Sequence, residues 1–173
     1  MLRVGFDLDG TLVDFEQGYL KRFKKWPNYD WAITRNVQNI LIKEREFWLN
    51  LPVLRTLEFT PKLYCSARVN NKRWTKEYLK RNDFPNAPLY QVPGYKLSKV
   101  KTLKGRVDVF IEDSIKNFID LNLHGIPWLL IDSPANKDWG PVLRIYSTTY
   151  EEIEDAYLLA RECNIFEDFN TLL

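Results

Sequence analysis

The stretch from Val4 to Asp14, Val-Gly-Phe-Asp-Leu-Asp-Gly-Thr-Leu-Val-Asp, constrains the fold of this chain more than any other. A short apolar run typical of a buried strand leads into Asp7 and Asp9, and Gly10 then interrupts the strand. Asp7 is therefore expected at the end of a strand, and Asp9 in the turn just beyond it. Open parallel sheets bind their ligands at this carboxyl end of the strands.

Two carboxylates at this spacing repel each other unless a cation or a shared proton lies between them. Magnesium is the usual cation at a site made only of oxygen ligands, so the turn predicts a Mg²⁺ site. Gly10 lets the backbone approach whatever binds there. The alternative is a hairpin turn in which Asp7 and Asp9 are solvated and bind nothing.

Strand and helix patterns alternate along the rest of the chain. Apolar runs typical of strands lie at residues 2–8, 62–68, 89–92, 107–111 and 128–132, and helical periodicity is seen at 71–82, 115–123 and 151–162. This alternation predicts an α/β fold, with a parallel sheet and helices on both of its faces.

Polar residues recur where the expected strands end. The second strand ends in Ser66, Ala67 and Arg68, and a hydroxyl beside free backbone N–H groups suits an oxyanion. The fourth strand leads into Glu112 and Asp113. Because adjacent strand residues face opposite ways, both acids cannot bind one metal equally. Asp113 lies nearer the turn and is assigned to the metal, whereas Glu112 is placed behind the metal ligands or against a metal-bound water.

In this order, these features resemble the motifs of the haloacid dehalogenase (HAD) superfamily, whose first motif, Asp-x-Asp-Gly-Thr, is complete here. Within it the chain looks most like the 5'(3')-deoxyribonucleotidase group. The similarity includes a short insert after the first motif, Ser-Ala-Arg at the second strand end, Ile-Glu-Asp-Ser at 111–114 and a Ser-Pro-Ala-Asn loop at 133–136. The chain departs from the group at Glu112, where a second aspartate is more usual.

The resemblance implies a fold and a chemistry. The fold would be a HAD-type, Rossmann-like parallel sheet, and the enzyme a phosphatase forming an aspartyl-phosphate. Asp7 would be the nucleophile and Asp9 the general acid and base. Mg²⁺ would be held by Asp7, Asp113 and the backbone carbonyl of Asp9. The implied phosphate-binding residues are Gly10, Thr11, Ser66, Ala67 and Arg68, with Thr11 also orienting Asp9.

A HAD phosphatase also needs one lysine that offsets the charge of the nucleophile and the phosphate. The segment 95–106 carries five cations: Lys96, Lys99, Lys101, Lys104 and Arg106. Lys99 is the choice, because it opens the short helix ahead of the next strand, and Lys101 is the alternative.

The insert after the first strand implies two domains: a catalytic core at residues 1–14 and 56–173, and a small helical cap at 15–55. Helices are expected from Phe15 and over residues 36–50, where Pro52 ends the pattern. The aromatic residues considered for stacking on a base or a sugar are Phe15, Trp31, Phe47 and Trp48. The alternative is that these aromatic side chains form the core of the cap itself.

Composition sets broad limits. With 173 residues, 45% of them hydrophobic, and a net charge of +2, the chain is long enough for one domain with a core, and its charge says little about partners. Two cysteines form no disulfide framework, which fits a reducing compartment. No apolar run approaches the roughly 20 residues that span a bilayer, and the first strand begins too early for a cleaved signal peptide. A cytoplasmic enzyme that contacts no membrane is expected, with its oligomeric state open.

The expected partner is a small phosphomonoester, with a nucleotide favoured. One alternative is a polynucleotide 3'-phosphatase, in which the basic segments 72–81 and 96–104 hold a nucleic-acid strand. Another is a phosphatase of sugar phosphates. A third, from a different class, is a catalytically silent module that keeps the fold and binds a ligand.

Overall fold

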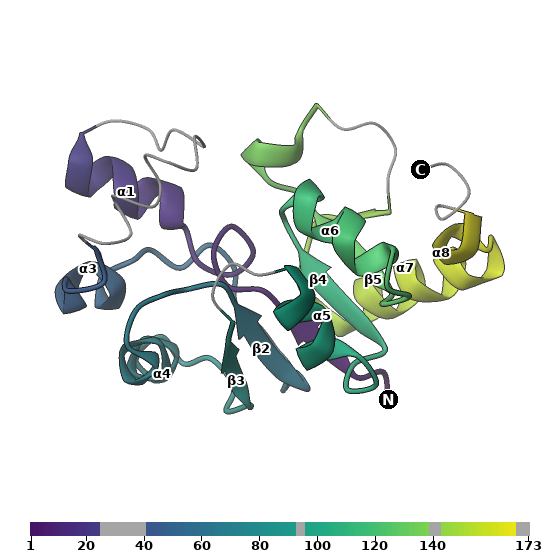
Figure 1. Cartoon of the computed structure of the whole chain (residues 1–173), viewed down its shortest axis with the longest axis horizontal. Coiled ribbons are helices and arrows are strands. Elements are labelled where there is room, and N and C mark those ends of the chain that lie inside the picture. The colour runs from purple at the N-terminus through teal and green to yellow at the C-terminus, as the bar shows by residue number, and fades with distance from the viewer. Residues whose placement is uncertain (25–40, 93–95, 139–142, 169–173) are drawn as a thin grey trace.

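The sheet of this protein is made of six parallel strands in the order β3-β2-β1-β4-β5-β6. The computed structural model describes residues 1–24, 41–92, 96–138 and 143–168 (Figure 1). The strands are β1 (Val4–Phe6), β2 (Leu63–Ser66), β3 (Leu89–Gln91), β4 (Val109–Glu112), β5 (Trp128–Ile131) and β6 (Arg144–Ile145). The predicted α/β class with a parallel sheet is confirmed.

The strand order reverses between β1 and β4. The chain builds the sheet outward from β1 through β2 to β3, and then returns to place β4 on the other side of β1. Phe6 pairs with Ile111 across this junction, and the Asp7 N–H continues the ladder by donating to the Ile111 carbonyl at 3.0 Å. Residues that follow β1 and β4 are therefore neighbours at the point where such sheets bind ligands.

Helices cover both faces of the sheet, as predicted. They are α1 (Phe15–Phe23), α3 (Arg45–Leu49), α4 (Lys72–Arg81), α5 (Lys96–Leu103), α6 (Ile115–Asn122), α7 (Tyr150–Glu162) and α8 (Ile165–Asp168), with a 3₁₀ turn η1 (Pro134–Asn136). Alternation along β4 separates two cores. Phe110 packs with α5 and α6 residues such as Leu103 and Leu121, whereas Ile111 packs with α4 and α7 residues such as Tyr78 and Ile153.

The insert after β1 differs from its prediction in one part. Helix α1 begins at Phe15 as expected, where Asp14 caps it by accepting the Gln17 N–H at 2.9 Å. A continuous helix over residues 36–50 is wrong where the chain is described, because α3 begins only at Arg45. The Leu41 carbonyl, which would bond the Arg45 N–H in a helix, accepts the Trp48 indole N–H at 2.8 Å and the Glu44 N–H at 3.0 Å instead. Residues 36–40 lie outside the described residues.

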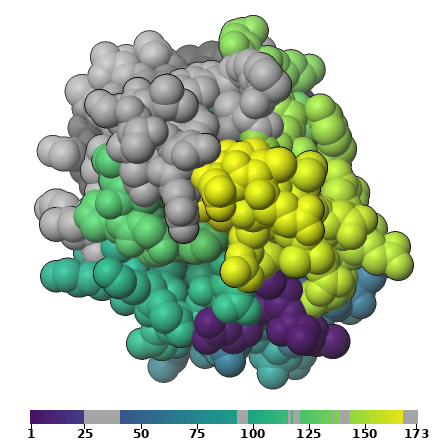
Figure 2. Space-filling view, turned by 90° about the vertical axis from the view of Figure 1, so that its right-hand side faces the viewer, coloured from purple at the N-terminus to yellow at the C-terminus, as the bar shows by residue number. Residues whose placement is uncertain are grey.

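The two ends of the sheet carry different elements. Helices α1 and α3 lie together at one end of the molecule, and α7 and α8 at the other (Figure 1). Figure 2 looks onto the second end, where α7 and α8 (yellow) lie beside the N-terminal residues (purple). There the Tyr150 hydroxyl accepts the Leu2 N–H at 2.6 Å. None of the described helices is both long and apolar enough to span a bilayer.

Candidate active site at the reversal of the sheet

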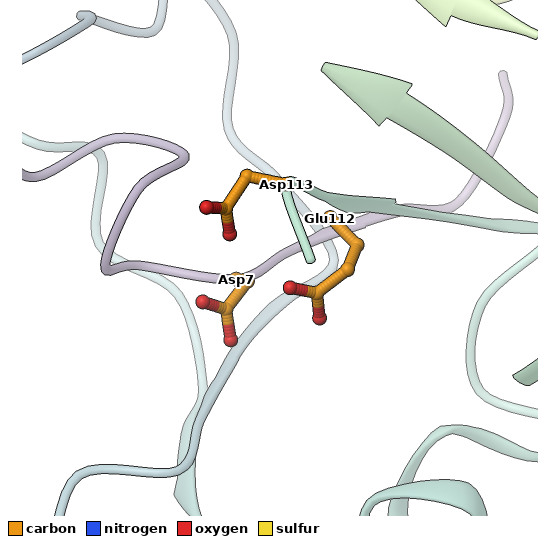
Figure 3. A group of neighbouring side chains, drawn as sticks. All are labelled: Asp7, Glu112 and Asp113. Carbon is orange, nitrogen blue, oxygen red and sulfur yellow. The ribbon is translucent and has the colours of Figure 1, made fainter. Parts of the chain in front are cut away.

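Three carboxylates meet where the strand order reverses. Asp7 follows β1 directly, Glu112 ends β4, and Asp113 is the next residue (Figure 3). Each offers a carboxylate oxygen, and the three oxygens lie within 4.8 Å of one another. Asp7 and Glu112 are buried, with 6% and 1% of their surface exposed. The parallel register of β1 and β4 brings these residues together from opposite halves of the chain.

Lys99 supplies the positive charge that faces this cluster. Its ammonium lies 2.9 Å from Asp7 Oδ1 and 2.5 Å from Glu112 Oε2, and the residue is buried. The second Glu112 oxygen accepts the Ser114 N–H at 3.2 Å, so both Glu112 oxygens already have donors. Lys101, the alternative lysine of the sequence interpretation, is exposed. Of the two, Lys99 is the lysine that the structure brings to the carboxylates.

Burial controls the charge of this site. It raises the pKa of Asp7 to about 7 against the opposing effect of Lys99, and raises the pKa of Asp113 well above its ordinary value, with Glu112 adding to the shift. Burial alone would lower the Lys99 pKa, but Asp7 and Glu112 raise it above its usual range, so Lys99 stays charged. Three carboxylates thus face one ammonium, which leaves the cluster short of positive charge.

The donor set fits a hard divalent cation. All of the candidate ligand atoms are oxygens, and they lie within the reach of a single ion. Both Glu112 oxygens already accept hydrogen bonds, whereas Lys99 bonds only one oxygen of Asp7, so Asp7 and Asp113 are the side chains with oxygens left for a metal. The assignment of Asp113 to the metal, with Glu112 behind the metal ligands, stays a prediction that this geometry fits.

The Asp9 side chain faces a different partner. Its Oδ1 lies 2.6 Å from Arg68 Nη2, and its Oδ2 accepts the Arg68 Nε–H at 2.8 Å. The structure therefore places Arg68, a predicted phosphate ligand, against the predicted acid and base. This pair joins residues 59 positions apart in the sequence.

The other predicted phosphate-binding residues differ in burial and in hydrogen bonding. Ser66 ends β2 and is buried, and its hydroxyl accepts the Arg68 N–H at 3.2 Å. Thr11 is fully buried, and its hydroxyl has no hydrogen-bond partner among the residues described. Ala67 is exposed, and Gly10 adopts a left-handed conformation with φ of +83°.

Gly10 packs directly against Asp113. A Cβ atom at this position would lie 2.0 Å from Asp113 Oδ2. We therefore expect Gly10→Ala to weaken Mg²⁺ binding by about 10–100-fold, the range seen when groups supporting a metal ligand are altered. Isothermal titration with Mg²⁺ measures this. The matched control is Gly105→Ala, where φ is +72° but no atom lies within 4 Å. Backbone strain should lower the free energy of unfolding of both variants by about 1–2 kcal/mol. Equal Mg²⁺ affinity in the two variants would contradict the prediction.

The aromatic residues considered for stacking on a base or a sugar differ in how deeply they are buried. Phe15, Phe47 and Trp48 form one cluster, with ring centroids 5.2–6.0 Å apart. Trp48 is buried in the core and bonded to Leu41, so the interpretation as internal packing fits it. Phe15 lines a cavity beside Asp113, and Phe47 is partly buried. Trp31 lies outside the described residues.

A cavity of about 330 Å³ opens beside Asp113. It is lined by Gly10, Asp14, Phe15, Glu16, Gln17, Leu54, Asp113, Ser133 and Pro134. The Ser133 hydroxyl is buried there without a hydrogen-bond partner in the part of the chain that is described. Sequence reasoning missed Asp14, Glu16, Gln17 and Ser133 as site residues. The one signal for Ser133 was that its loop follows a strand at the same edge of the sheet.

Arg55 was also missed. It donates to the backbone carbonyls of Thr11, at 2.9 Å, and Asp132, and so ties the turn after β1 to the end of β5. An arginine in a loop carries no sequence signal for such a contact.

Neither the protein-family models nor the curated proteins that we searched contain a match to this chain. The fold and the site define its class by themselves: an α/β protein with a Rossmann-like, all-parallel sheet and a buried acidic cluster where the strand order reverses.

Proposed function

We propose that this protein is a Mg²⁺-dependent phosphatase of the HAD type that hydrolyses nucleoside monophosphates through an aspartyl-phosphate. The observation that carries the proposal is the cluster of Asp7, Glu112 and Asp113 with Lys99 inserted between the carboxylates. The HAD resemblance calls for carboxylates such as Asp7 and Asp113 at the strand ends and for one lysine, which is Lys99 on α5, whereas Glu112 stands where a second aspartate is more usual. Residues 15–55 would form its small cap.

The reaction follows from the groups in place. Asp7 attacks phosphorus, the bond to the ester oxygen breaks, and Asp9 gives its proton to the departing alcohol. Water then attacks the aspartyl-phosphate and loses its proton to Asp9, which releases phosphate and restores Asp7. Lys99 offsets the charge of Asp7 and of the bound phosphate. When bound, Mg²⁺ would be held by Asp7, Asp113 and the Asp9 carbonyl, and would supply positive charge against the repulsion between phosphate and carboxylate.

The cavity beside Asp113 supports an uncharged leaving group. Phe15, Leu54 and Pro134 offer apolar surface, whereas Asp14 and Glu16 add negative charge. No lysine or arginine is among the described residues that line it. A second phosphate in this cavity would therefore meet carboxylates and no cation, whereas a nucleoside or a neutral sugar fits the lining.

Phosphate release from a panel of substrates tests the proposal. It comprises deoxynucleoside 5'- and 3'-monophosphates, a nucleoside diphosphate, sugar phosphates and a 3'-phosphorylated oligonucleotide, each with Mg²⁺ and with a chelator. We expect Mg²⁺-dependent release from the nucleoside monophosphates and little from the diphosphate. Release from sugar phosphates alone would change the proposed substrate class from nucleotides to sugar phosphates. No release from any compound by the folded protein would refute the proposed phosphatase activity.

One observation favours a second candidate, a polynucleotide 3'-phosphatase. Helix α4 exposes five cations, Lys72, Arg73, Lys76, Lys80 and Arg81. Its one acid, Glu77, already pairs with Arg45 and Arg81. A strand held along this face through several phosphates would bind with steep salt dependence, whereas a mononucleotide would not. Binding of a 3'-phosphorylated oligonucleotide from 50 to 300 mM salt separates the two: a flat response excludes the second candidate.

A further inference from the structure

We infer that Arg68 positions Asp9 as a general acid, and that Trp48 holds Arg68 in place. The inference rests on the proposed function, since it assigns Asp9 a proton transfer. It gives Arg68 a role beyond the phosphate contact expected from the sequence. It also makes Trp48 on α3 part of the catalytic geometry without any contact to the substrate.

Arg68 and Asp9 form an ion pair through two contacts. Nε and Nη2 of Arg68 each bond a different oxygen of Asp9, at 2.8 and 2.6 Å. Such a two-point contact fixes the plane of the carboxylate as well as its position. The Arg68 side chain is fully buried, whereas a quarter of the Asp9 side chain is exposed. The Asp9 carboxylate is thus held by the buried Arg68 side chain, and part of its surface remains accessible to solvent.

Arg68 is itself held in place by aromatic rings and by hydrogen bonds of its backbone. Its guanidinium carbon lies 5.2 Å from the Trp48 ring centroid and 5.6 Å from that of Tyr78, within the range of cation–π contact. Its backbone N–H donates to the Ser66 hydroxyl, and its carbonyl accepts from the Gln91 amide at 3.2 Å. Its Nη1 has no hydrogen-bond partner among the described residues, so this nitrogen can still donate to a phosphate while Nε and Nη2 hold Asp9. These contacts favour Arg68 as a fixed support for Asp9, with any phosphate contact made through Nη1 alone.

The ion pair leaves Asp9 able to exchange a proton. Each carboxylate oxygen has two lone pairs, and Arg68 occupies one on each, so Asp9 can still take a proton on its exposed side. Held in this plane, Asp9 can give a proton to the departing alcohol and take one from the hydrolytic water in the second half of the reaction.

Leaving-group dependence distinguishes this role from a structural one. An alkyl phosphate such as a nucleoside monophosphate needs a proton at the departing oxygen, whereas p-nitrophenyl phosphate releases a stable phenolate without one. We expect Arg68→Met to lower kcat/KM for the nucleotide by at least about 100-fold, the lower end of general acid catalysis. For p-nitrophenyl phosphate we expect a loss of at most about fivefold, since no proton is transferred to its leaving group in the first step. Arg68→Lys, which keeps the charge but not the two-point contact, should fall between wild type and Arg68→Met for the nucleotide.

Two further variants complete the design. Trp48→Leu removes one ring from the guanidinium and leaves the ion pair, so we expect the same selective loss on a smaller scale. It also tests the inference if Arg68→Met does not fold, which thermal unfolding with Mg²⁺ would reveal. Arg3→Met is the matched control. Arg3 contacts Asp108 through two nitrogens on an exposed surface, so its loss should leave both rates unchanged.

The outcomes separate this inference from the proposed function. Equal losses for the two substrates in folded Arg68→Met, or in Trp48→Leu, would overturn the positioning role. A rise in KM for both substrates with kcat unchanged would overturn it too, because Arg68 would then bind phosphate. If the wild-type protein hydrolyses neither substrate, the proposed function fails and the inference fails with it.

Discussion

Asp7→Asn is expected to lower Mg²⁺-dependent phosphate release by at least about 10³-fold, since removing a nucleophile eliminates the reaction path itself. The asparagine side chain has nearly the same shape, and Glu112 remains to accept from Lys99, so the fold should be kept. A continuous phosphate assay measures the loss, and thermal unfolding checks the fold.

The control for this variant is Asp108→Asn. Asp108 directly precedes β4 and accepts hydrogen bonds from Arg3, but it is not part of the carboxylate cluster and is partly exposed. Its substitution should leave phosphate release unchanged. If Asp7→Asn retained more than about a tenth of wild-type release, Asp7 could not be the nucleophile.

Lys99→Met is expected to destabilise the metal-free protein by about 3–5 kcal/mol, the cost of leaving a buried charge without its partner. The methionine fills a similar volume, so the loss reflects charge and hydrogen bonds at Asp7 and Glu112 rather than a cavity. Urea unfolding at pH 8 measures it. Added Mg²⁺ should restore part of the stability, because a divalent cation offsets the same negative charge.

Lys101→Met is the matched control, with the same change two residues away at an exposed position. Its effect should stay within about 0.5 kcal/mol, as for most surface substitutions. Equal effects of the two variants on stability would contradict the placement of Lys99 between the carboxylates.

The stability lost in Lys99→Met should depend on pH. Burial raises the pKa of Asp7 to about 7 and the pKa of Asp113 above its ordinary value even with Lys99 present, and removing the ammonium raises the pKa of Asp7 further. Between about pH 4 and these raised values, the folded state binds more protons than the unfolded state. The free energy of unfolding must then fall as pH rises. We expect the metal-free variant to be more stable at pH 5 than at pH 8, and the opposite slope in urea unfolding would contradict this charge balance.

Local chemistry made much of the site predictable. The apolar run before Asp7, the glycine after Asp9 and the paired acids after the fourth strand each carry a short-range signal, and the parallel topology brings them together. Lys99 could have been preferred over Lys101 on firmer grounds. Lys99 lies four residues before Leu103, on the same side of α5, and Leu103 is fully buried. Lys101 lies about 200° around the helix from Lys99.

Contacts between distant segments were not predictable from one sequence. Nothing near Arg68 indicates that its partner is Asp9, because the pair depends on how β2 is placed beside β1. The break before α3 arises from the bond between Trp48 and Leu41, which competes with the helical pattern. Strand β6 has only two residues, Arg144 and Ile145, too few to show a period.

The mass of the protein during turnover tests Asp7 as the nucleophile most directly. Asp9→Asn would be mixed with Mg²⁺ and p-nitrophenyl phosphate, which needs no proton to form the intermediate but needs Asp9 to hydrolyse it, and quenched in acid. The predicted result is one added phosphoryl group, mapped to the peptide that contains Asp7 and absent when Asp7 is also replaced by Asn. Phosphate release by the wild-type protein, with no phosphoryl group on Asp7 in either the wild type or Asp9→Asn, would contradict the mechanism.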